Sequence, residues 1–172
     1  FNFKYSNTFI LPEPFIPKIG SRIMSLQDPL KKMSKSDNNL NNIIALLDSN
    51  DDIKRKINKA VTDSGSEIKY SKSRPGLSNL IDLYISLTKE SLIEIEEKYE
   101  GKMYSQLKSD LIEIIIDCLN PIRNKYNKII EDKNYLNSIL MDGSEKASTI
   151  ARKTLSKVYR KVGFVKKIKL KW

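Results

Sequence analysis

Residues 103–130 read MYSQLKSDLIEIIIDCLNPIRNKYNKII, and this stretch decides the fold because it is the longest helical pattern in the chain. Its apolar side chains recur every three or four residues, which is the spacing of one face of an α-helix. Pro121 interrupts the run, and a proline ring removes a backbone donor and clashes with the preceding turn. We therefore expect a mainly α-helical fold, with a kink or break of this helix at residues 117–121.

Apolar side chains at helical spacing also precede this stretch. One helix is expected to begin at residue 40, because Leu40, Ile43, Ile44 and Leu47 would share a face. Further helices are expected at 51–61, after residue 76 and at 92–101.

Polar residues mark several of the helix ends. Ser91 and Glu94 form a capping box, and Asn50 or Asp51 is the expected N-cap of the helix at 51–61. Residues 142–145 are expected to end a small helix and to begin the last one. From residue 41 onward the sequence thus predicts a helical bundle.

The first forty residues lack the helical pattern. Residues 9–17 contain three prolines and are expected to be extended. Residues 22–26, Arg-Ile-Met-Ser-Leu, read as a short β-strand that ends at a turn. A single strand needs partner strands, which this chain does not supply, so we expect the chain to be a piece of a longer protein.

Composition excludes several kinds of chemistry. The chain has 172 residues, of which 40% are hydrophobic and 30% charged, as in globular proteins, and no window is apolar enough to cross a membrane. It has no histidine, so it cannot by itself form a Ser–His or Cys–His nucleophilic pair. The single cysteine, Cys118, excludes an internal disulfide and a cysteine-rich zinc site, and it fits a reducing compartment.

The positive charge is concentrated at the C-terminus. The formal net charge is +10, and residues 143–172 hold ten basic side chains against one acid, Glu145. Clustered lysines and arginines favour a polyanionic partner, nucleic acid before membrane, because they displace counterions from phosphates. A solvated helix face is the alternative interpretation.

One short motif indicates phosphate chemistry. Lys32-Met33-Ser34-Lys35-Ser36 lies between the expected strand and the expected helix, the position at which loops of nucleotide-binding α/β folds meet phosphates. Its two ammonium groups and two hydroxyls are phosphate ligands, and Asp37 can cap the next helix and orient the loop. The alternative is a solvated loop of lysines and serines.

The pentapeptide resembles the second signature of class I aminoacyl-tRNA synthetases. Several flanking segments narrow the resemblance to the bacterial-type tryptophanyl enzymes: Phe9–Pro14, Arg22–Leu26, Asp28–Pro29, Ala60–Ser64 and Pro75–Leu80. The resemblance runs from about Phe1 to Val165 and covers the C-terminal half of such an enzyme. It implies that most of the nucleotide fold, the histidine-containing first signature and most of the tryptophan pocket lie outside this chain.

The resemblance also implies an organisation and an activity. Residues 1–40 would form the C-terminal edge of a Rossmann-like nucleotide-binding domain, and residues 41–165 a helical domain of the anticodon-binding type. Residues 166–172 extend beyond the usual family end and would be a basic tail. The whole enzyme would activate tryptophan with ATP and transfer it to tRNA as a cytoplasmic homodimer, whereas this piece alone would be inactive.

The resemblance also implies roles for single residues, each taken from the matching position of the family's motif. Lys32 and Lys35 would be catalytic and neutralise charge on the α-phosphate and the departing pyrophosphate. The full set for ATP would be Ile23, Lys32, Met33, Ser34, Lys35 and Ser36, with Ile23 and Met33 at the adenine. Mg²⁺ would arrive with ATP, and no protein site for a metal is recognisable. The tRNA backbone would meet Arg152, Lys153, Lys157, Arg160 and Lys161, and Tyr159 could stack on a base.

Two alternatives remain open at this point. The chain could be a stand-alone helical RNA-binding module in which the lysine loop only clamps a phosphate. It could also belong to the sibling tyrosyl enzyme, which shares the loop but fits the flanking segments less well.

Overall fold

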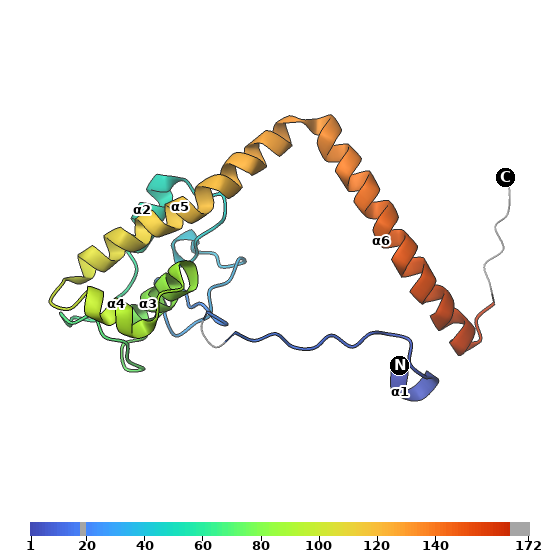
Figure 1. Cartoon of the computed structure of the whole chain (residues 1–172), viewed down its shortest axis with the longest axis horizontal. Coiled ribbons are helices and arrows are strands. Elements are labelled where there is room, and N and C mark those ends of the chain that lie inside the picture. The colour runs from blue at the N-terminus through green and yellow to red at the C-terminus, as the bar shows by residue number, and fades with distance from the viewer. Residues whose placement is uncertain (18–19, 166–172) are drawn as a thin grey trace. The chain divides into compact units, whose positions relative to one another are not determined.

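The computed structural model describes residues 1–17 and 20–165, and within these ranges the chain is mainly helical and has no β-strand (Figure 1). The predicted mainly α-helical class is confirmed. The chain divides into two compact units. One is Ile16–Asn127, and the other combines Phe1–Phe15 with the chain from Lys128 onward.

The unit Ile16–Asn127 is held by one apolar core to which several helices contribute. These are α2 (Asn50–Asn58), α3 (Pro75–Thr88), α4 (Leu92–Lys98) and most of α5 (Tyr104–Glu131). The predicted capping box of Ser91 and Glu94 begins α4. The most enclosed core residues are Ile53, Ile57, Leu77, Leu80, Ile81, Tyr84, Ile95, Tyr99, Leu107 and Leu111.

Helix α5 runs from Tyr104 to Glu131 with Pro121 inside it (Figure 1). Of the expected kink or break at residues 117–121, the break is therefore wrong. An internal proline costs a helix about 3 kcal/mol. The face that precedes it is buried in the core up to Leu119, and this packing keeps the segment helical. Beyond the proline the apolar stripe leaves the core, because Ile122 and Tyr126 are 45% and 41% exposed.

The apolar spacing from residue 40 does not form the expected helix. Only a single 3-10 turn, η1 (Leu40–Asn42), forms there, with Asn39 rather than Asp37 as its cap. The side chain of Asn39 satisfies the local backbone in place of a helical hydrogen bond, since it accepts the Asn41 amide at 3.0 Å. The next helix, α2, is capped by Ser49, not by Asn50 or Asp51.

Residues 22–26 do not form the expected strand. In the described residues the only ladder contact is an isolated antiparallel bridge between Met24 and Lys32. The backbone N–H and C=O of Met24 are bonded instead by the side chain of Asn79, each at 2.8 Å. A side chain of α3 thus takes the place that a neighbouring strand would fill.

The other unit contains α1 (Asn2–Tyr5), the extended residues 9–15 and helix α6 (Lys133–Val162). Helix α6 continues through residues 142–145, so the predicted division into two helices is wrong. Gly143 lowers helix stability by only about 1 kcal/mol relative to alanine, and the ion pair of Lys146 with Asp142 (2.6 Å) spans it. The predicted basic tail at 166–172 lies outside the described residues.

Candidate functional site

The first residues of the signature loop, 31–33, are held against residues 23–25 by backbone hydrogen bonds. The Ser25 amide donates to the Lys31 carbonyl at 2.8 Å, and the Met33 amide donates to the Ile23 carbonyl at 3.0 Å. At the tip between these segments, the ammonium of Lys31 lies 2.8 Å from Asp28, whose pKa this contact lowers. Ile23 and Met33, which the sequence predicted for one adenine site, are therefore brought side by side.

The second half of the loop presents its polar groups to solvent. Lys32, Ser34, Lys35 and Ser36 are all exposed. The Asp37 amide donates to the Ser34 carbonyl at 3.1 Å, and this turn places the hydroxyls of Ser34 and Ser36 3.1 Å apart. Cations and hydroxyls presented together from one turn can neutralise and bind a polyphosphate.

Asp37 braces the end of the loop. One carboxylate oxygen accepts the Asn39 amide at 2.8 Å, and the other accepts the side-chain amide of Asn42 at 2.9 Å. The hydrogen bonds from Asn42 and Asn39 lower the pKa of Asp37, so it stays ionised as a brace. The predicted orienting role fits this geometry, although the helix cap is Asn39.

An apolar cavity of about 560 Å³ adjoins the loop. Met33 and Lys35 belong to its wall, and the other walls come from the segment after the loop and from α5: Ile43, Ile44, Ala45, Leu46, Leu47, Ile122 and Tyr126. One side of the signature loop, residues 31–36, thus borders an apolar cavity, and its other side is open to solvent.

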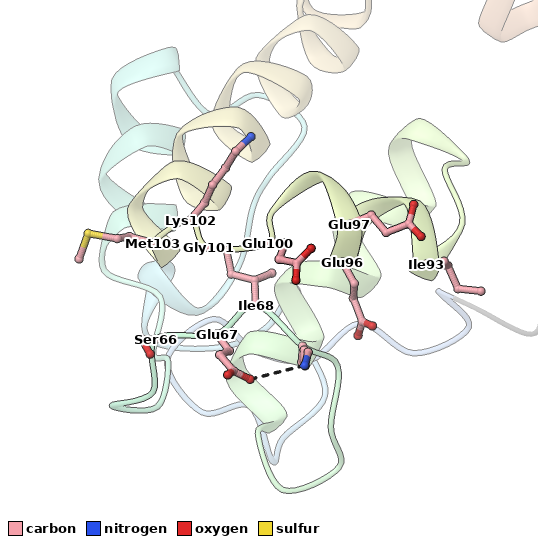
Figure 2. A pocket seen from close by; sticks show the side chains of 11 residues that line it. Ser66, Glu67, Ile68, Ile93, Glu96, Glu97, Glu100, Gly101, Lys102 and Met103 are labelled. Atoms are coloured by element: carbon pink, nitrogen blue, oxygen red, sulfur yellow. Dashed lines mark ion pairs between the residues drawn. The ribbon is translucent and has the colours of Figure 1, made fainter.

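A second cavity, of about 670 Å³, lies beside α4 (Figure 2). Four carboxylates line it, from Glu67, Glu96, Glu97 and Glu100, and Figure 2 shows the one ion pair there, which joins Glu67 to Lys69 at 3.7 Å. It contains none of the predicted site residues. Its negative charge opposes a phosphate ligand.

The predicted tRNA-contacting residues lie on α6, in the other unit. Arg152, Lys153, Lys157 and Arg160 are exposed. Lys161 is half-buried, because its ammonium donates to the Asn7 carbonyl at 2.9 Å and to the Thr8 hydroxyl at 2.6 Å.

Tyr159, the candidate for base stacking, packs edge-on against Phe164, with ring centroids 5.6 Å apart. It is 40% exposed, so part of the ring remains open to solvent.

Within residues 1–17 and 20–165, no helix is long and apolar enough to cross a membrane. No group of three or more Cys, Asp or Glu side chains in that part is arranged to hold a metal ion.

The sequence of residues 1–120 matches the family described as tRNA synthetases class I (W and Y). This match spans more than half of the chain, and the chain belongs to that family of class I synthetases.

Several relatives within the family are tryptophan enzymes. A tryptophan–tRNA ligase from Clostridium acetobutylicum is 50% identical over 165 residues, which are 96% of this chain and 49% of that protein. One from Listeria monocytogenes is 49% identical over 168 residues, which are 97% of this chain and 50% of that protein. The chain therefore spans about half the length of the curated relatives that it matches.

Solved structures that resemble this chain are also tryptophanyl-tRNA synthetases. Tryptophanyl-tRNA synthetase from Mycoplasma pneumoniae is 32% identical, with a TM-score of 0.84 over 95% of this chain and 50% of that chain. The enzyme from Campylobacter jejuni, complexed with ADP and tryptophan, is 29% identical, with a TM-score of 0.65 over the same shares.

Proposed function

We propose that this chain is part of a tryptophan–tRNA ligase and supplies its phosphate-binding loop and its helical tRNA-binding region. The observation that carries the proposal is the exposed pair Lys32 and Lys35 on a loop whose first residues are fixed to residues 23–25 by backbone bonds. The 50% identity to an enzyme of that name supports the same assignment. The chain alone is expected to be inactive.

In the activation step a carboxylate oxygen of tryptophan attacks the α-phosphorus of ATP, the bond from that phosphorus to the bridging oxygen breaks, and pyrophosphate leaves. Lys32 and Lys35 neutralise the charge that builds up on the α-phosphate and the pyrophosphate. These contacts raise the rate only if they are stronger in the transition state than with bound ATP. The ribose hydroxyl at the end of the tRNA then attacks the tryptophanyl carbonyl and releases AMP.

The other residues of the site bind ATP but do not neutralise its charge. The hydroxyls of Ser34 and Ser36 donate to phosphate oxygens, and Ile23 and Met33 line the adenine ring. Mg²⁺ enters as part of the ATP substrate. The tryptophan pocket lies mostly outside this chain, and the whole protein is a homodimer.

The finer architecture also belongs to the proposal. Residues 1–40 are the C-terminal edge of a Rossmann-like domain, and residues 41–165 are a helical domain of the anticodon-binding type. Support for the tRNA role comes from α6, whose exposed basic side chains can meet a phosphate backbone.

A chimera tests this function. In it, the chain replaces the matching segment of the Clostridium acetobutylicum relative, and tryptophan-dependent exchange of pyrophosphate into ATP is measured. We expect exchange with tryptophan and none with tyrosine. Changing Lys32 or Lys35 to Ala should slow the exchange by about a hundredfold each, as removal of one transition-state donor commonly does.

Lys31→Ala is the matched control, because this neighbouring lysine is 80% exposed and paired with Asp28. It should leave the rate within about twofold, as expected for a screened surface pair. A chimera that is folded by circular dichroism but lacks tryptophan-dependent exchange would refute the assignment of this chain to a tryptophan enzyme. Equal rates for Lys32→Ala, Lys35→Ala and Lys31→Ala would refute the phosphate role.

A further inference from the structure

We propose that Asn79, on α3, is a positioning residue that fixes the signature loop; this inference rests on the proposed function. Asn79 is only 3% exposed. The side-chain oxygen accepts the Met24 amide and the side-chain nitrogen donates to the Met24 carbonyl, both at 2.8 Å. One buried amide thus bonds both backbone groups of a single residue outside its own helix.

Met24 is the residue through which this contact reaches the loop. It forms the isolated bridge to Lys32, and the residues on either side of it bond the neighbours of Lys32. Ser25 bonds the backbone of Lys31, and Ile23 bonds that of Met33. A shift of Met24 therefore moves the backbone on both sides of Lys32.

Helix α3 provides a firm base for Asn79. Pro75 is at the first turn, and Gly76 lies so close to the preceding segment that an added Cβ would be 2.2 Å from the Val61 carbonyl oxygen. Leu77 and Leu80, on either side of Asn79, are 0% and 1% exposed in the core. The segment Pro75–Leu80, which carried part of the family resemblance, therefore joins the core to the catalytic loop.

The neighbouring Ser78 provides an internal comparison. Its hydroxyl accepts the Ser71 amide at 3.1 Å and donates to the Ser71 carbonyl at 2.8 Å, and the residue is 6% exposed. Ser78 thus bonds both backbone groups of one residue, as Asn79 does. It holds the loop before α3 rather than the signature loop, so Ser78→Ala matches Asn79→Ala in helix, burial and number of bonds lost.

The experiment compares Asn79→Ala with Ser78→Ala in the chimera described above. Asn79→Ala should lower kcat for tryptophan-dependent pyrophosphate exchange by about ten- to a hundredfold, because misplacing catalytic groups by about 1 Å has effects of that size. The KM for tryptophan and the transfer of tryptophan from preformed adenylate to tRNA should stay within about twofold, because the loop acts on the phosphates of ATP. Ser78→Ala should leave kcat within about twofold at a comparable melting temperature.

Amide hydrogen exchange on the 172-residue chain gives a readout that needs no activity. Asn79→Ala should speed exchange at Met24, Ser25 and Met33 by at least about tenfold, whereas Ser78→Ala should speed it at Ser71. Unchanged exchange at Ser25 and Met33 would overturn the inference, as would equal losses of kcat in the two variants. If the folded chimera lacks tryptophan-dependent activity, the proposed function fails, and hydrogen exchange alone decides whether Asn79 holds the loop.

Discussion

The ammonium of Lys56 lies 2.6 Å from a carboxylate oxygen of Asp48, and both side chains are nearly enclosed, with exposed fractions of 4% and 14%. The same oxygen accepts the Ala45 amide at 2.9 Å, and the Asp48 carbonyl accepts a hydrogen bond from Arg123 of α5. The ion pair therefore joins α2 to the turn that follows the signature loop, and α5 holds that turn from the other side.

Lys56→Ala should lower the free energy of unfolding by about 3–5 kcal/mol, because it leaves the Asp48 carboxylate buried without its partner. Urea denaturation of the chain measures this loss. Lys54→Ala, an exposed lysine on the same helix, is the control and should change stability by less than about 0.5 kcal/mol. Removing both charges, with Asp48→Asn and Lys56→Met, should recover much of the loss, and equal effects of Lys56→Ala and Lys54→Ala would contradict this account.

Ser49 caps α2, and its removal should be measurable. Its hydroxyl accepts the Asp52 amide at 3.1 Å and donates to the Asp52 carboxylate at 2.6 Å. Ser49→Ala should lower the free energy of unfolding by about 1 kcal/mol, whereas Ser49→Asn should retain most of the capping. Thermal melts of the two variants compare them directly, and equal melting temperatures would show that the cap does not stabilise the helix.

The same contact gives α2 a dependence on acid. The hydrogen bond from Ser49, followed by that from Arg55, lowers the pKa of Asp52 from the ordinary 3.8 to about 2. A carboxyl whose folded pKa is lowered stabilises the fold above pH 3.8, and this contribution is lost as the pH falls toward 2. In Ser49→Ala the pKa of Asp52 should rise toward 3.8, which an NMR titration of the carboxyl group measures. An unchanged pKa would show that the hydrogen bond from Ser49 is not its cause.

The helices that fill the core were predictable from the sequence, because burial imposes a strict spacing. Leu77, Leu80 and Tyr84 of α3 lie where the pattern placed them. The same spacing failed after residue 40, because the side chain of Asn39 bonds the local backbone and that of Asn42 bonds the Asp37 carboxylate. The sequence pattern also overstated the effect of Pro121. Its local free-energy cost is smaller than the stabilisation that the helix gains from packing in the core.

The candidate loop was predictable as a motif, but not its support. Lys32 and Lys35 could be identified because the whole pentapeptide Lys32–Ser36, placed between an expected strand and an expected helix, rarely arises by chance. Asn79 is 55 residues from Met24, and nothing in the spacing of a buried helix tells which polar residue turns toward a distant backbone. The one signal was the segment Pro75–Leu80, which carries part of the family resemblance but whose polar residues have no role assigned by it.

The basic face of α6 should bind tRNA with a strong salt dependence. Lys153→Ala and Lys157→Ala should each reduce the slope of log K against log salt by about 0.7–1, because each removes one phosphate contact and its released counterion. Lys146→Ala is the control, since that ammonium lies 2.6 Å from Asp142. Lys161→Ala should change the slope less than Lys157→Ala, because Asn7 and Thr8 already hold its ammonium. Filter binding from about 50 to 200 mM salt makes the comparison, and slopes that do not differ among the four variants would rule out this face.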